Sequence, residues 1–123
     1  MENKKTKRYL YFLFEDEGPV YLKEKALLDV LEKYPCFEIN GDNCSAFIDD
    51  LNLFLDGNYK SKRKFIIIDT EKISIEEQNR LCSIVKDKSY QATFLPDNCK
   101  VVVLGKREKM DKELLSLLVV IDV

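Results

Sequence analysis

Two short, unbroken apolar runs, FIIID at residues 65–69 and CKVVVLG at residues 99–105, constrain the fold more than any other feature of this chain. Apolar runs of this length, bounded by polar and glycine-containing segments, are typical of strands that are buried on both faces. Such strands occur in parallel sheets that are covered by helices. The two runs therefore predict an α/β protein with a mostly parallel sheet.

The rest of the chain alternates between the same two kinds of segment. Further strands are predicted at residues 8–14, 36–39 and 119–123, which brings the predicted number of strands to five. Apolar residues at helical spacing predict helices at residues 21–34, 45–55, 74–88 and 110–118. Ser74 with Glu77 forms a capping-box pattern, and Asp111 is the predicted cap of the last helix. Strands that alternate with helices favour a three-layer sandwich, here a single domain over residues 1–123.

Composition and charge limit the classes of function. Hydrophobic residues make up 46% of the 123 residues and charged residues 34%, which is enough apolar material for one core. The net charge of −2 disfavours a nucleic-acid partner, although lysine-rich segments leave a salt-sensitive nucleic-acid binder open as an alternative. No apolar run approaches the length of a membrane span, and no signal peptide is recognisable. We therefore expect a cytoplasmic protein without a membrane partner.

The cysteine and histidine content points away from metal and histidine chemistry. The chain has no histidine, and its four cysteines, at positions 36, 44, 82 and 99, form no C-x-x-C pair. This content disfavours a zinc site and any mechanism that uses a histidine base. The thiols are predicted to lie in or near the core, in a reducing compartment.

The segments that follow the strands are the predicted place for a ligand, because parallel α/β sheets bind ligands at the carboxyl ends of their strands. In this chain those segments are EDEGPVYLKEK, NGDN, DTEKIS and GKREKMD. Asp69 ends a buried strand, and Asp16 lies in an acidic group directly after the first predicted strand. Asp16 and Asp69 are therefore candidate ligands of a shared magnesium ion. The alternative is that Asp69 only caps a turn.

Several motifs in the second half occur in the order seen in one family of ATPases. They are ISIEEQNRL, FLPDN, KVVVLG and KELLSLLVVIDV, and they follow an apolar strand that ends in an acid. In this order they resemble the second half of an AAA+ ATPase core of the MoxR-like and dynein-related group. That resemblance implies a P-loop-type sheet with strand order 5-1-4-3-2, in which the first strand lies between the fifth and the fourth.

By the same resemblance, GPVYLKEKALL occupies the phosphate-loop (Walker A) position. The resemblance then implies a vestigial cofactor-binding set of Gly18, Pro19, Lys25 and Asp69, with Asp69 at the magnesium-site (Walker B) position. Tyr21 and Lys23 stand where the family has glycines, and side chains there would block the backbone amides from phosphate.

Charge is also reversed in this loop. Glu24 replaces the phosphate-binding lysine, and Lys25 replaces the hydroxyl residue that binds magnesium. A glutamate at this position repels triphosphate, so the loop is predicted to bind ATP and magnesium weakly at most.

The remaining catalytic positions of the family are altered as well. Thr70 replaces the catalytic glutamate, unless the register shifts by one residue and places Ile68 at the acid and Asp69 at the glutamate. Leu104 and Gly105 occupy the sensor-one position, and Leu117 stands where the arginine finger is expected. The family's helical lid would follow Val123 and is not recognised. No catalytic residue is therefore assigned, and no ATP hydrolysis is predicted.

These observations predict a non-catalytic AAA+-like module that acts through protein–protein contact. Its expected partner is an active AAA+ subunit or another copy of the chain, and residual nucleotide binding stays open. A second resemblance, to receiver domains of two-component systems, gives the alternative function. In that alternative Asp69 accepts a phosphoryl group with magnesium held by Glu15 and Asp16, but the chain lacks the family's Ser or Thr after the fourth strand and its Lys after the fifth.

Overall fold

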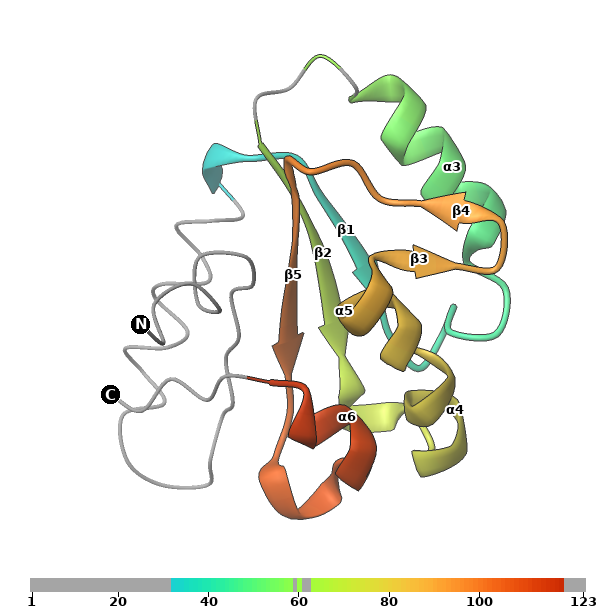
Figure 1. The fold of residues 1–123 in the computed structure, drawn as a ribbon, viewed down its shortest axis with the longest axis vertical. Coiled ribbons are helices and arrows are strands. Elements are labelled where there is room, and N and C mark those ends of the chain that lie inside the picture. The colour runs from blue at the N-terminus through green and yellow to red at the C-terminus, as the bar shows by residue number, and fades with distance from the viewer. Residues whose placement is uncertain (1–31, 59, 61–62, 119–123) are drawn as a thin grey trace.

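The computed structural model describes residues 32–58, 60 and 63–118 (Figure 1). Its strands are β1 (Cys36–Ile39), β2 (Lys64–Asp69), β3 (Ser89–Tyr90), β4 (Thr93–Phe94) and β5 (Cys99–Leu104). Its α-helices are α3 (Ile48–Gly57), α4 (Ile75–Arg80), α5 (Cys82–Asp87) and α6 (Lys112–Ser116). Two 3-10 turns, η1 (Thr70–Lys72) and η2 (Arg107–Lys109), follow the carboxyl ends of β2 and β5.

The main sheet contains β1, β2 and β5 in that order, all parallel. Ile39 of β1 lies opposite Ile68 of β2, and Ile68 lies opposite Val103 of β5. Figure 1 shows the three strands running side by side toward the same edge. The loops that follow them therefore gather at one end of the molecule.

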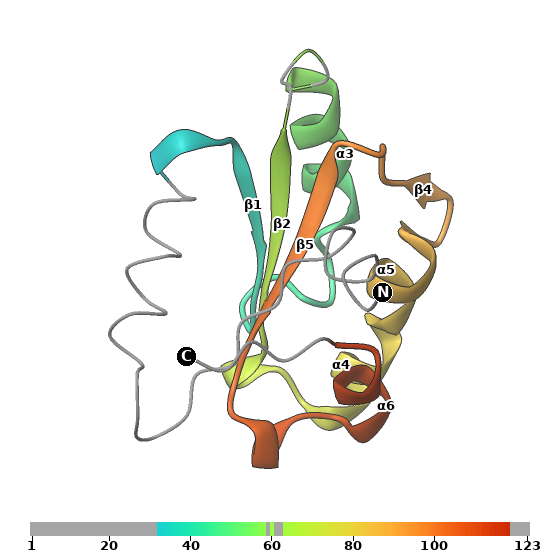
Figure 2. The ribbon, with the colours of Figure 1, turned by 60° about the vertical axis from the view of Figure 1, so that its left-hand side comes forward.

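The two faces of the sheet carry separate apolar clusters because side chains alternate along each strand. Ile66 and Ile68 belong to the larger cluster, which also contains Leu51 of α3, Ile84 of α5 and Leu114 of α6. The described helices therefore cover this one face, as the turned view in Figure 2 also shows. On the opposite face lies a smaller cluster, formed by Phe65, Ile67, Val102 and Leu104 with Tyr34 and Cys36 packed against it.

The helix predicted at residues 74–88 is divided in two. Leu81, which is only 1% exposed, ends α4 and begins α5, and its N–H donates to the Gln78 carbonyl at 3.0 Å. The predicted caps are confirmed. The Ser74 hydroxyl accepts from the Glu77 N–H at 3.2 Å, and the Asp111 carboxylate accepts from the Leu114 N–H at 2.9 Å.

A short hairpin follows α5 and lies outside the main sheet. Strands β3 and β4 pair antiparallel, with Tyr90 opposite Thr93. Tyr90 packs its ring against Phe47, with 4.9 Å between the ring centroids. The Thr93 hydroxyl donates to Asn52 Oδ1 at 3.0 Å, so the hairpin lies beside α3 in the layer that covers the sheet. The hairpin predicted as an option for residues 89–98 is confirmed.

The prediction of one five-stranded sheet in the order 5-1-4-3-2 is wrong. The described residues form a three-stranded parallel sheet and a separate two-stranded antiparallel sheet. An apolar run shows that a segment is buried, but it does not show which neighbour the segment pairs with, and the polar hairpin strands gave no such signal. The strands predicted at 8–14 and 119–123 lie outside the described residues.

Lys64 differs from most lysines, whose charged ends lie in solvent. Its side chain is fully buried at the start of β2, and its ammonium donates to Asn98 Oδ1 at 3.2 Å. The lysine therefore belongs to the interior at the amino end of the sheet, away from the strand-end loops.

Candidate functional site

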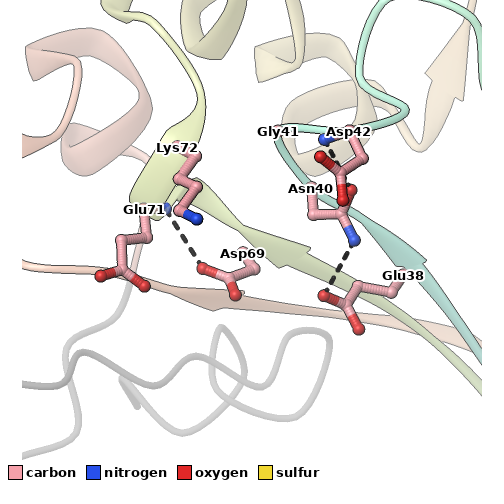
Figure 3. Close-up of a pocket in the computed structure, with 7 residues that line it drawn as sticks. All are labelled: Glu38, Asn40, Gly41, Asp42, Asp69, Glu71 and Lys72. Carbon is pink, nitrogen blue, oxygen red and sulfur yellow. Dashed lines mark hydrogen bonds between the residues drawn. The ribbon is translucent and has the colours of Figure 1, made fainter.

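A polar pocket opens at the carboxyl edge of the sheet, between the loops that follow β1 and β2 (Figure 3). Its volume is about 230 Å³, and it is lined by Glu38, Asn40, Gly41, Asp42, Asp69, Glu71 and Lys72. Glu38 lies opposite Ile67, so Glu38 and Asp69 project from the same face of their neighbouring strands. This pocket is the place where a parallel α/β sheet binds its ligand, and we take it as the candidate site.

The loop after β1 is folded by its own asparagine side chains. Asn40 Oδ1 accepts from the Asp42 N–H at 2.9 Å, and Asn43 Oδ1 accepts from the Asn40 N–H at 2.8 Å. The Asn43 amide also donates to the Glu38 carbonyl at 2.8 Å. Such bonds between Asn side chains and nearby backbone are the physical reason why an N-G-D-N sequence forms a turn. They hold one wall of the pocket in place.

Gly41 lets this loop approach the turn after β2. A Cβ atom on Gly41 would lie 2.6 Å from Lys72 Cβ and 2.7 Å from the Lys72 carbonyl oxygen. Atoms of these kinds do not approach so closely, so any larger residue would push the two loops apart. The glycine therefore serves the packing of two walls of the pocket against each other.

The two residues at the end of β2 have different tasks. Asp69 Oδ1 accepts from the Glu71 N–H at 3.1 Å, which caps the 3-10 turn, while the partly exposed carboxylate also lines the pocket. Thr70 is only 3% exposed, and its hydroxyl donates to the Leu104 carbonyl at 2.8 Å. Gly105 packs so closely against the Thr70 hydroxyl that a Cβ there would overlap it. Thr70 thus connects the ends of β2 and β5 and faces away from solvent.

A buried amide fixes the third strand-end loop. Gln78, which is 1% exposed, donates to the carbonyls of Ile73 at 2.8 Å and of Lys109 at 3.3 Å, and its Oε1 accepts from the Asp111 N–H at 2.8 Å. The neighbouring Asn79 donates to the carboxylates of Asp111 and Glu113, both at 3.0 Å. The Q-N pair of the ISIEEQNRL motif therefore attaches α4 to the loop before α6.

The electrostatics of the pocket are dominated by carboxylates. Four of the seven lining residues are acids, and Lys72 carries the one positive charge among them. Figure 3 shows Glu38, Asp69 and Glu71 projecting into the same open space. A pocket with this charge favours cations or hydrogen-bond donors and repels phosphate groups. Within the described ranges, however, no three Asp, Glu, His or Cys side chains are grouped closely enough to hold a metal ion.

None of the four thiols is in a disulfide, and burial favours their neutral form. Three of them are buried, and Cys36 is half-buried. Burial raises the pKa of Cys82 and of Cys99 to about 11, and raises the pKa of Cys36 and Cys44 as well. A neutral, buried thiol is a poor nucleophile, so these side chains act as core residues.

Of the predicted site residues, Asp69 is the one that the structure places in the pocket. The predicted partners Glu15, Asp16, Gly18, Pro19 and Lys25 lie outside the described residues. Sequence reasoning selected the NGDN and DTEKIS segments from their position after strands, but it did not single out Glu38, Glu71 or Lys72. The pairing of β1 with β2 brings these three together, and no local motif marks it.

Comparison with known proteins adds no family assignment. No protein-family model matches the chain, and no curated protein matches its sequence. The AAA+ resemblance therefore stays a prediction from the motifs. Within the part of the chain that the structure describes, no helix has both the length and the apolar character needed to cross a membrane.

Proposed function

We propose that this chain is a non-catalytic, AAA+-like module that acts through protein–protein contact. The observation that carries the proposal is the position of Thr70, which stands where the AAA+ ATPases have their catalytic glutamate when Asp69 is aligned with the magnesium-site acid. Its side chain is buried and its hydroxyl is bonded to the Leu104 carbonyl, so this position supports the fold and is not directed at a substrate.

The charge of the pocket supports the same proposal. A triphosphate at the strand ends would face Glu38, Asp69 and Glu71, with Lys72 as the single cation lining the pocket. Because like charges repel, nucleotide affinity is expected to be low. The described residues that line this pocket do not fit a bound magnesium nucleotide.

The motif that carries the family resemblance has a structural task in this chain. Gln78 and Asn79 both bond the loop between β5 and α6. The preserved motif is thus explained by the architecture it holds together, without any need for ATP chemistry. We propose an active AAA+ subunit or a second copy of the chain as the partner. The four cysteines, none of them in a disulfide, favour the cytoplasm as the compartment.

Two measurements on the purified chain test the proposal. Millimolar ATP with magnesium is expected to leave the thermal midpoint unchanged, because a ligand that bound the native state would raise it. Phosphate release is expected to stay at the level of a buffer blank. Robust hydrolysis that is abolished by Asp69→Asn would contradict the proposal.

A second candidate function, a receiver-like phosphoacceptor, is favoured by one observation. The Asp69 carboxylate ends a central buried strand and lines an open pocket, which gives a small phosphodonor access to it. Incubation with acetyl phosphate and magnesium tests this function directly. An alkali-labile, hydroxylamine-sensitive mass increase on the wild-type chain that Asp69→Asn lacks would support it. An unmodified wild-type chain would exclude it.

A further inference from the structure

The outward surface of α3 and of the neighbouring hairpin carries large exposed apolar side chains together with several acids. Leu53 on α3 is 70% exposed and Phe94 on β4 is 74% exposed. We call this area, consisting of Asp49, Asp50, Leu53, Asp56 and Phe94, the α3–hairpin surface. We propose that it docks a basic, amphipathic segment of a partner protein. This inference rests on the proposed function, because it names the surface through which such a module would act.

Leu53 and Phe94 both point away from the core, on two neighbouring elements. Leu51 is the buried residue of α3, and Leu53 is turned about 200° around the helix from it, so it points away from the core. On the hairpin, Thr93 turns toward Asn52, and the next residue, Phe94, points to the opposite side. Because the Thr93–Asn52 hydrogen bond places the hairpin beside α3, the two exposed apolar side chains belong to adjacent elements of the layer that covers the sheet.

The charged residues of α3 that flank Leu53 are all acids. Asp49, Asp50 and Asp56 lie three or four residues from it, which places all of them on the adjacent turns of the same helix face. The chain has no Lys or Arg between residues 45 and 59 or between residues 89 and 99. Within these two segments the charged residues are therefore acids, while Lys60, Lys88 and Lys100 lie just outside them. Two apolar anchors with acids on the same elements are the complement of an apolar stripe flanked by lysine or arginine.

Asp56 gives an independent reason to expect a cationic partner. Asp49 and Asp50 lie in the first turn of α3, where the helix dipole favours an acid. Asp56 lies in the last turn, where the dipole disfavours an acid, and no basic residue is present in that turn. The charge of Asp56 is thus unfavourable with respect to the dipole of its own helix, and a cation at this end of α3, supplied by Lys60 or by a partner, would relieve this.

The experiment titrates the full chain with a synthetic amphipathic peptide and follows backbone amide signals by NMR. The peptide has leucines at helical spacing and lysines at the other positions. We expect saturable shifts centred on residues 48–57 and 93–94. Leu53→Ser and Phe94→Ser should each weaken binding about tenfold, as loss of a central anchor does. Ile75→Ser is the matched control, because Ile75 is also exposed, at 51%, but lies outside the surface.

A scrambled peptide of the same composition, which forms no apolar face, separates docking from charge attraction. Equal binding of the scrambled peptide, shifts centred elsewhere, equal effects of all three serine variants, or no binding at millimolar peptide would each overturn the inference. None of these results affects the proposed absence of ATP hydrolysis, which is measured separately. Conversely, hydrolysis that depends on Asp69 would remove the proposed function and leave peptide binding at this surface to be judged by its own titration.

Discussion

The carboxyl edge of the sheet and the outer surface of α3 use polar residues in opposite ways. At the edge, the side chains of Asn40, Thr70 and Gln78 bond to the backbone of other loops or of their own loop. On α3, by contrast, Asp49 and Asp56 are exposed and lie around an apolar side chain. At the sheet edge, the polar side chains form hydrogen bonds that hold the loops of the chain together. The outer surface of α3 leaves both its charges and its apolar area available to another molecule.

This difference matters because α/β proteins usually place their chemistry at the strand-end edge. In this chain the polar groups at that edge bond to the chain itself to a large extent, with Thr70 and Gln78 buried while doing so. A buried polar group whose partner is removed costs more free energy than the bond itself contributes. Substitutions at the edge should therefore lower stability, whereas substitutions on the α3–hairpin surface should affect binding.

The largest effect is expected for Gln78→Ala. The substitution removes all three hydrogen bonds of the buried amide and leaves two carbonyls and the Asp111 N–H without their partner. We expect a loss of about 3 kcal/mol in the free energy of unfolding, measured by urea denaturation. Asn79→Ala is the matched control on the next residue. Its side chain is exposed and bonds only other side chains, so a loss of about 0.5 kcal/mol is expected. Equal losses for the two variants would show that the buried amide of Gln78 is not what holds α4 to the loop before α6.

A smaller effect is expected for Gly105→Ala, because the added methyl group overlaps the Thr70 hydroxyl. Overpacking of this kind costs about 2 kcal/mol. Thr70→Ala alone should cost about 1 kcal/mol, since it leaves the buried Leu104 carbonyl without its donor. The double variant should be more stable than the sum of the two losses predicts, because Thr70→Ala also removes the atom that clashes. Strict additivity in urea denaturation would rule out this contact as the reason for glycine at position 105.

The sequence predicted the parts of the fold that depend on local patterns. Apolar runs predicted the buried strands at 65–69 and 99–105. The positions of Ser74 and Asp111 before helices predicted them as helix caps. The division of the predicted helix at Leu81 was not visible, because Leu81 continues the apolar face of α4 and belongs to the core. Local periodicity reports which face is buried, not where the helix axis changes direction.

The sequence indicated where the candidate site lies, but it did not predict which residues meet there. Position after a strand selected the segments around Asn40 and Asp69, and the structure brings both into one pocket. Glu38 joins that pocket only because β1 pairs with β2 in one particular register. Pairing and register depend on contacts between residues that are distant in sequence. For the same reason the predicted five-stranded sheet failed, since apolar runs did not reveal which strands pair or that β3 and β4 form a sheet of their own.

The smallest effect concerns Asp56, and it has the opposite sign from those at the sheet edge. Asp56→Lys replaces an acid in the last turn of α3 with a base, which the helix dipole favours, so the isolated chain should gain about 0.5 kcal/mol. Asp49→Lys, in the first turn of the same helix, should lose a similar amount. Both changes should shrink in 1 M salt, because ions screen exposed charges.

The two aspartate variants also connect stability with binding. If the α3–hairpin surface docks a basic segment, Asp56→Lys and Asp49→Lys should both weaken binding of the lysine–leucine peptide, although they change stability in opposite directions. A residue kept only for the fold would not behave in this way, because its replacement would not improve stability while impairing binding. Should Asp56→Lys destabilise the chain in urea, the carboxylate has a structural task within α3, and the charge argument for a cationic partner loses its independent support.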